Sequence, residues 1–280
     1  MSKQLDASQT IERFGVSRTA WRVGVICFFA LFALLGAVLS LVNGSTDIPF
    51  SQIMEILAAP GTDPHSMIIW NIRLPRTIVG ALVGINLALS GAILQAILRN
   101  PLADPHLIGI SSGAGVAGVV IMILYPALEY LITPVSFIGA MVAAVCIYIL
   151  AWKNGIKPVR IILAGVAVSA FLSAGISGLM IFYSDRVHGA LMWMVGGLAA
   201  RSWPHVSIIL PYAVIGVVLA LASAAYLNIL QLGDEMARGL GINVEITRVV
   251  LTAIAALLAA SAVSVVGLLG FVGLVVPHAA

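Results

Sequence analysis

Three short stretches of the sequence combine charged, proline and glycine residues in arrangements that could bind another protein. In the first, Arg73-Leu-Pro-Arg76, two cations lie three residues apart around a proline of the kind that begins helices. Such a pair could anchor a helix end at a lipid–water interface, or it could form ion pairs with an acidic partner. The spacing alone leaves both interpretations open.

The second stretch, from Gly233 to Gly241, predicts a helix of about one and a half turns that glycines enclose. Its two leading acidic residues suit the positive N-terminal end of a helix, and Arg238 suits the negative end. Gly239 can supply a left-handed stop, and Asn243 can cap the helix that follows. A solvated loop is the plain alternative, but a short capped helix could also fit a groove in a partner protein.

The third stretch is a proline-containing turn that leads into a run of glycines. Two prolines bracket a segment that cannot form a regular helix, and the small residues after it allow helices to approach closely. We interpret this stretch as packing at a hinge between helices, with an ordinary turn as the alternative. The residues are Asn100, Pro101, Asp104, Pro105, Gly109, Gly113 and Gly115.

The sequence lacks the motifs of a nucleotide-binding loop and of a zinc metalloprotease. The lysines, Lys3, Lys153 and Lys157, are not followed by Ser or Thr, so there is no P-loop for a nucleotide. The H-E-x-x-H motif of metalloproteases does not occur either. We predict no catalytic residue and no metal site, and an intramembrane protease is a distant alternative.

The composition is that of a membrane protein. Only 9% of the 280 residues are charged, against about 25% in a soluble domain, and 61% are hydrophobic. Mean hydropathy is +1.12. These values argue against a soluble enzyme, a nucleic-acid-binding module and a disordered tail. The basic residues are scattered, which also argues against nucleic acid.

Charge-free stretches divide the chain into segments long enough to cross a membrane. Each has at least 22 residues, and a bilayer core about 30 Å thick needs about 20 apolar residues of helix. We predict an all-α integral membrane protein with about seven complete spans and part of an eighth, after a polar tail at 1–22. The stretches are 23–46, 77–98, 105–128, 130–152, 161–184, 202–233 and 249–280.

The distribution of basic residues orients these spans. With the N-terminus in the cytoplasm, 10 Lys and Arg residues lie inside and 4 outside, as the positive-inside rule requires. Arg73 and Arg76 then lie outside, where positive charge is disfavoured, which favours the acidic partner. The 233–241 helix lies inside.

Two connecting segments predict short helices, one in 44–76 with Ile48, Ile53, Ile56 and Leu57 on one face, and one within 187–200. Cys27 and Cys146 lie inside spans, where we expect small core residues and no disulfide.

The spans contain no Asp, Glu, Lys or Arg near their middle. Secondary transporters usually place ionisable groups there, so that class is a distant alternative. A zinc or manganese ion would also need ligands along its path. A passage without fixed charge suits a bulky cargo whose charge is already enclosed, such as a chelate.

Eight strings in this sequence, in order, resemble the permease family of ABC importers for iron–siderophore complexes, haem and vitamin B12, the FecCD type. They extend over nearly the whole chain. The strings are Ile72 to Arg76, Leu89 to Ala92 with Gln95, Asn100 to Pro105, Gly109 to Gly115, Leu163 to Val166, Met192 to Gly197, Leu232 to Gly241, and Gly270 to His278.

The resemblance implies a ten-helix permease domain, here residues 23–280 without its last spans, in the cell membrane. It implies pairing with a second permease subunit, identical or not, and with two cytoplasmic ATPase subunits that hold ATP and Mg²⁺. An extracytoplasmic substrate-binding protein would dock on Arg73 and Arg76. The ATPase would receive Leu232, Gly233, Asp234, Glu235, Met236, Ala237, Arg238, Gly239, Leu240 and Gly241.

The cargo that the resemblance favours is a ferric siderophore, with cobalamin and haem as alternatives. The permease itself would carry no cofactor and hydrolyse no ATP. In that family an arginine and two further spans follow the string that here reads Pro277-His-Ala-Ala280.

Overall fold

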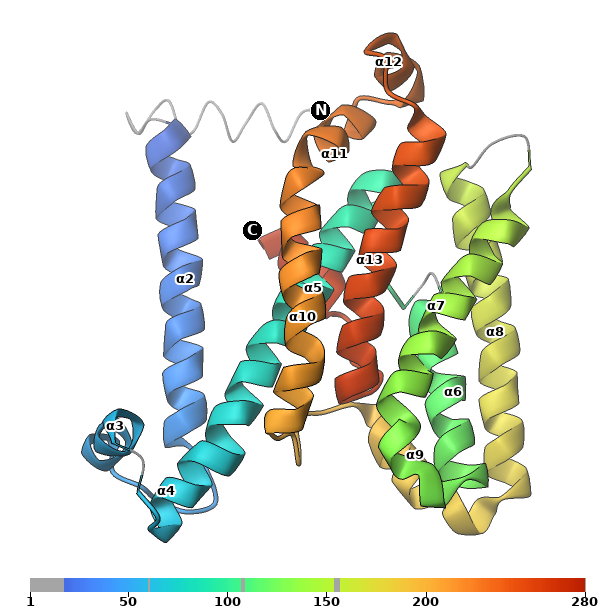
Figure 1. Ribbon diagram of the computed structural model, residues 1–280. Coiled ribbons are helices and arrows are strands. Elements are labelled where there is room, and N and C mark those ends of the chain that lie inside the picture. Colours follow the sequence, from blue (N-terminus) through green and yellow to red (C-terminus); the bar gives the residue numbers. More distant parts are fainter. Residues whose placement is uncertain (1–17, 60, 107–108, 154–156, 280) are drawn as a thin grey trace. The chain divides into compact units, whose positions relative to one another are not determined.

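The computed structural model describes residues 18–59, 61–106, 109–153 and 157–279, and every regular element in these ranges is a helix (Figure 1). The helices are α2 (Arg18–Val42), α3 (Phe50–Ala58), α4 (Pro64–Ile68), η1 (Ile69–Arg73), α5 (Leu74–Leu98), α6 (Ile110–Leu124), η2 (Pro126–Leu131), α7 (Ile132–Ala151), α8 (Pro158–Phe182), η3 (Ser184–Arg186), α9 (Val187–Val195), α10 (Trp203–Ala222), α11 (Ala224–Gln231), α12 (Asp234–Gly239), α13 (Val244–Val266) and α14 (Val272–Ala279).

The chain forms two compact units, one ending at Thr77 and the other running from Ile78 to Ala279. Most of the predicted tail lies outside the described residues, and its last residues, from Arg18 on, already belong to α2.

Six helical segments in the described ranges are long and apolar enough to cross a membrane. They are Val23–Val42, Pro64–Leu98, Pro126–Ala151, Pro158–Phe182, Trp203–Ala222 and Val244–Val266. All six correspond to predicted spans, so the predicted class of an all-α membrane protein agrees with the structure.

The third predicted span, 105–128, is shorter than expected. It yields only α6, whose 15 residues extend over roughly 22 Å, less than the roughly 30 Å hydrocarbon core. The helix cannot begin earlier, because Gly109 before it has a left-handed φ of 72°. Gly109 also lies beside Ile147, one turn before α7 ends. The proline- and glycine-containing turn therefore takes the place of the missing helical turns.

Helix α13 is the centre of the second unit. Within its most apolar part 78% of the residues are buried, more than in any other described span. It lies between α10 and α7 (Figure 1), and alanines and serines along it let these helices approach closely. Two buried hydrogen bonds tie it to α5: the Asn86 amide donates to the Ser261 hydroxyl (2.9 Å), and the Ser90 hydroxyl donates to the Ala255 carbonyl (2.7 Å).

The first unit has its own small core between α2 and η1. Ile53 and Ile56 are the buried face of α3, as the amphipathic pattern predicted, and they pack with Ile48 and Ile69. The Trp70 indole donates to the Ile56 carbonyl at 3.2 Å. The loop that follows α2 is therefore packed against this core. Arg73, at the end of η1, donates a hydrogen bond to the same loop.

The short helix expected within 187–200 is α9, with Trp193 buried on it. Both cysteines are free, as predicted, but Cys27 and Cys146 are exposed on their helices. The expectation of core positions was wrong, because lipid-facing and core-facing positions of a membrane helix are equally apolar and the sequence does not separate them.

The α6–α7 crossing allows a direct test of the packing. A Cβ atom added to Gly113 would lie 2.5 Å from the Ala143 Cβ and would also clash with the Gly139 carbonyl. We expect Gly113→Ala to destabilise the second unit by about 1–3 kcal/mol, as overpacking does. Thermal unfolding in detergent measures this.

Gly175→Ala on α8 is the matched control, because a Cβ atom there meets nothing within 4 Å. Equal melting temperatures for the two variants would contradict the close α6–α7 contact.

Candidate functional site

Helix α12 is a six-residue helix with glycines at both ends. Gly233, its N-cap, has φ 110°, and Gly241 after it has φ 82°, values that L side chains rarely adopt. The sequence placed the left-handed stop at Gly239, but that residue is helical and Gly241 takes this role. Helix α12 continues through Gly239, so the left-handed residue follows two positions later than expected.

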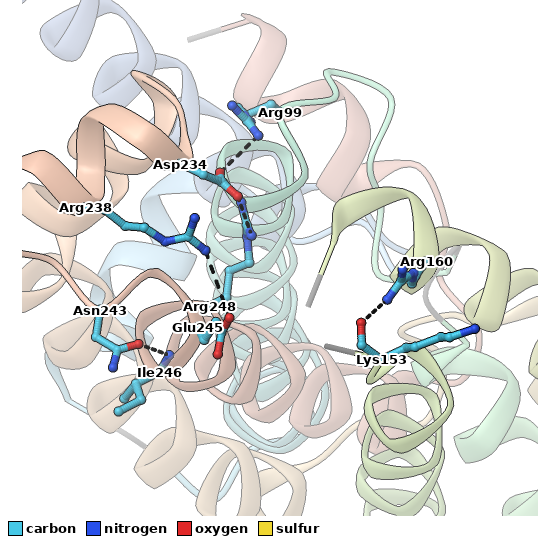
Figure 2. Close-up of polar contacts among 9 residues, drawn as sticks. All are labelled: Arg99, Lys153, Arg160, Asp234, Arg238, Asn243, Glu245, Ile246 and Arg248. Carbon is cyan, nitrogen blue, oxygen red and sulfur yellow. Dashed lines mark hydrogen bonds and ion pairs between the residues drawn. The ribbon is translucent and has the colours of Figure 1, made fainter. Parts of the chain in front are cut away.

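The Asp234 carboxylate at the start of α12 is bound by two arginines from other elements (Figure 2). Arg248, on the second turn of α13, donates from Nη2 to Oδ1 (2.7 Å) and from Nη1 to Oδ2 (3.1 Å). Arg99, directly after α5, donates from Nη2 to Oδ1 (3.1 Å). One carboxylate thus joins α5, α12 and α13.

These ion pairs differ in exposure. The Arg248 side chain is 1% exposed, whereas that of Arg99 is 41% exposed. A bidentate contact between a guanidinium and a carboxylate is among the stronger charge-assisted hydrogen bonds. An exposed ion pair, in contrast, contributes only about 0–1 kcal/mol to stability. The Arg248 pair is therefore the stronger tie, and the Arg99 pair adds a weaker link to α5.

The hydrogen bond from Arg248 holds the pKa of Asp234 below its ordinary value, assisted by the charges of Arg248, Arg99 and Arg238 and opposed by burial. The folded pKa is lower than the unfolded one, so the stabilisation is present above the unfolded value of about 3.9. It is lost as pH falls through the folded value. The carboxylate is therefore charged throughout the physiological range.

The α12 segment exposes three large apolar side chains beside the charged Glu235 and Arg238. Met236 is 59% exposed, and Leu232 before the helix and Leu240 after it are 63% and 58% exposed. Only Ala237 of α12 is buried against the rest of the unit. Next to it, the Asn243 side chain accepts a hydrogen bond from the Ile246 amide (3.1 Å) and caps α13, as predicted (Figure 2).

The turn 99–105 starts at the same end of the unit as α12. Asn100 accepts from the Leu102 amide (3.0 Å), and the buried Asp104 accepts from the His106 amide (2.8 Å), so both polar side chains stabilise the turn itself. Pro105 and Asp104 also face Gly273 on α14, where a Cβ atom would lie 3.0 Å from Pro105 Cδ. The turn is packed against α14.

The remaining residues of the predicted hinge lie where helices meet. Gly109 lies near the Ser169 hydroxyl of α8, and Gly115 near Ile176 and Leu268, each of which would be 3.3 Å from an added Cβ. Pro101 faces a depression lined also by Gln95 and Arg99. These positions are packing sites at the α6 junctions.

The two arginines of the Arg73-Leu-Pro-Arg76 string have different environments. Arg73 is 5% exposed, and its Nη1 donates to the carbonyls of Leu41 (2.7 Å) and Val42 (2.8 Å). Its Nη2 donates to the Thr46 carbonyl. The last carbonyls of a helix lack partners within it and favour a nearby cation, so Arg73 serves as a cap for α2.

Gly44 lies directly against this guanidinium, because a Cβ atom there would be 2.5 Å from Arg73 Nη2. Arg76, one turn further on, is only partly buried. The string was expected to begin a helix, but the helix is already under way at Pro64 and passes through η1. The structure thus gives Arg73 an internal role that the spacing did not indicate.

Two features were missed by the sequence reasoning. The first is Arg248, which was counted only as a basic residue. An arginine at the fifth position of an apolar helix, with an aspartate in the short helix before it, is a signal for an ion pair.

The second missed feature is a cavity of about 750 Å³ at the far end of α13, lined among others by Glu129, Arg201 and Ser264. Burial lowers the pKa of Arg201 from its ordinary value.

One further string, Gly175-Ile-Ser-Gly178, has the G-x-S-G spacing of intramembrane serine proteases. In α8 the Ser177 hydroxyl donates to the Ser173 carbonyl one turn earlier (3.0 Å). This bond within the helix is common for serine in membrane helices. The serine is therefore explained without catalysis. Among the described residues no three His, Cys, Asp or Glu side chains group as a metal site.

Comparison with known proteins identifies the family. The sequence profile of the FecCD transport family matches residues 30–280. The chain belongs to the FecCD transport family. The eight strings that predicted this membership are confirmed.

Individual relatives agree with the assignment. Over 261 residues the chain is 35% identical to the Fe(3+)-citrate import system permease protein YfmD of Bacillus subtilis, covering 93% of this chain and 78% of that protein. Over 240 residues it is 42% identical to the cobalamin import system permease protein BtuC of Halobacterium salinarum, covering 84% of this chain and 65% of that protein.

A solved structure, assigned to the metal-chelate type of ABC transporter in an inward-facing conformation, superposes with a TM-score of 0.79 and 27% identity. The match covers 91% of this chain and 80% of that chain. This FecCD chain is therefore a multi-pass membrane protein and the permease of an ABC importer.

The burial of Arg73 leads to a prediction about stability. We expect Arg73→Ala to destabilise the first unit by about 1–3 kcal/mol, because three carbonyl groups lose their donor. Limited proteolysis between α2 and α3, together with thermal unfolding, would show the loss.

Arg76→Ala removes the same charge one turn away and is expected to leave both measurements unchanged. If the two variants behaved alike, Arg73 would not be the cap of α2.

Proposed function

We propose that this FecCD permease carries a ferric siderophore inward across the cell membrane, driven by ATP that a partner subunit hydrolyses. The observation that carries the proposal is α12: a short helix, fixed by ion pairs, with large apolar side chains exposed around it. Exposed apolar residues on a fixed helix favour insertion into a groove of another protein. The partner groove would belong to the ATPase, which would hold ATP and Mg²⁺.

The cargo assignment rests on the chemistry of the spans and on the relatives. The spans lack charged groups near their middle, which suits a cargo whose metal charge is enclosed by a chelator. YfmD is named for Fe(3+)-citrate, and another relative, 35% identical over 255 residues, is the iron(3+)-hydroxamate permease FhuG of Bacillus subtilis. Cobalamin is the second candidate, because the BtuC relative has the higher identity of 42%.

The proposed orientation places the N-terminus and α12 in the cytoplasm and the η1 end of the long Pro64–Leu98 helix outside. The count of 10 inner against 4 outer basic residues supports it. On the outside, an extracytoplasmic binding protein would dock through carboxylates on Arg76. Arg73 would support this contact by fixing the loop after α2. A second permease subunit would complete the passage.

Uptake into proteoliposomes tests the proposal. The chain is reconstituted with the ATPase, binding protein and second permease of the same source. We expect radiolabelled ferric siderophore to accumulate only when ATP is supplied on the ATPase side. The uptake of ferric citrate, a ferric hydroxamate, cobalamin and haem is compared, which identifies the preferred cargo.

Accumulation under a pH or sodium gradient without nucleotide would show a secondary transporter and overturn the proposal. Preference for cobalamin over every ferric chelate would leave the ATP-driven mechanism in place and reassign the cargo.

The apolar surface around α12 is tested separately. We expect Met236→Glu to weaken binding of the ATPase by about tenfold, because a charge replaces a side chain that binding would desolvate. Pull-down of detergent-solubilised complexes measures the affinity. Tyr130→Glu is the control, since Tyr130 is 75% exposed but lies in η2, away from α12. Unchanged affinity in Met236→Glu would place the ATPase contact elsewhere.

A further inference from the structure

Helix α12 has little to hold it in place besides ion pairs. It contains six residues, and an isolated helix of that length is not stable in water. Ala237 is its only buried side chain. The chain enters and leaves the helix through Gly233 and Gly241, which both adopt positive φ. Glycine joints transmit force poorly, because their backbone has the greatest conformational freedom.

The Asp234 carboxylate connects α12 to other parts of the unit through side-chain contacts that do not involve these glycines. It is in the first turn of α12, and it binds Arg248 through both oxygens and Arg99 through one (Figure 2). Figure 2 shows the two arginines approaching the carboxylate from opposite sides. The second ion pair of α12, between Arg238 and Glu245, is 4.0 Å long with both side chains well exposed. It is the weaker link by distance and by solvent screening.

The two arginines connect Asp234 to helices at the centre of the second unit. Arg248 is buried in α13, and the Tyr148 hydroxyl of α7 donates to its backbone carbonyl at 3.2 Å. Arg99 directly follows α5, which is bonded to α13 through Asn86 and Ser90. A displacement of Asp234 therefore acts directly on Arg248 in α13 and on Arg99 next to α5, in addition to the chain connections that join α12 to α11 and α13.

We propose that Asp234 is the positioning residue that passes the movement of α12 to α5 and α13, so that ATP-driven motion of α12 opens the passage. The proposal rests on the proposed function of α12 as the ATPase contact. It assigns the mechanical link to one carboxylate and its two arginines. Asp234 touches neither nucleotide nor cargo, and its effect is on the coupling between them.

The test uses the ion pairs of α12 in the complete reconstituted transporter. Asp234→Asn removes the charge that binds Arg248 and Arg99. Glu245→Gln makes the same kind of change on α13 and removes only the weak, exposed pair with Arg238. Uptake per ATP hydrolysed is measured together with the amount of ATPase bound. We expect Asp234→Asn to lower uptake per ATP about tenfold with the ATPase still bound, which is within the range of couplings between sites. Glu245→Gln is expected to match the wild type, because an exposed pair at 4.0 Å contributes little.

A normal ratio of uptake to hydrolysis in Asp234→Asn would overturn the proposal. If that variant fails to assemble because it leaves Arg248 buried without its counter-charge, Arg99→Gln decides, since it cuts only the partly exposed link to α5. A lowered ratio in Arg99→Gln supports the link, and an unchanged ratio overturns it. A wild-type complex without ATP-dependent uptake would instead contradict the proposed function, so the two failures are distinguishable.

Discussion

A membrane protein must provide partners for its own polar groups, because the hydrocarbon core contains no water to do so. This constraint explains where the polar contacts of the chain occur. Within the spans, Asn86 and Ser90 donate to α13 instead of remaining unpaired. At helix ends, Arg73 binds the last carbonyls of α2, and Arg248 binds Asp234. Among the described residues, the buried arginines Arg73 and Arg248 both bind groups at helix ends.

The same constraint separates structural charge from charge available to partners. Arg73 and Arg76 look equivalent in the sequence, yet one is a buried cap and the other is partly exposed. Asp234 and Glu235 are likewise adjacent acids with different roles, one bound by two arginines and one exposed. Under the proposed function, only the more exposed member of each pair is free to contact another protein.

Movement of the permease depends on which contacts are stiff. The glycines around α12 and the turn 99–105 are positions where the backbone leaves regular helix, and the close contacts at Gly109 and Gly113 restrict how α6 lies against α7 and α8. Between the flexible joints, the ion pairs of Asp234 provide a short path from α12 to the central helices. Flexible joints bridged by specific contacts suit a protein that changes conformation as a few rigid parts.

The sequence by itself determined the class and most of the organisation. Charge-free stretches identified the spans, because a helix in lipid needs about 20 apolar residues whatever it packs against. The helical spacing of apolar residues in 44–76 predicted the buried face of α3. The acidic residues between glycines predicted α12. Eight strings in order identified the family. These are local properties, since each depends on residues close together in the chain.

The tertiary structure decided what depends on distant residues. The sequence did not show that α6 would start only after Gly109, which has a left-handed φ of 72° and lies close to Ile147 and Ser169 in other helices. It did not show that Arg73 faces carbonyls about 30 residues earlier, or that Asp234 meets Arg99 across 135 residues. A charge or glycine in the sequence has a known chemistry but no known neighbour, and only the folded chain supplies the neighbour that gives it a role.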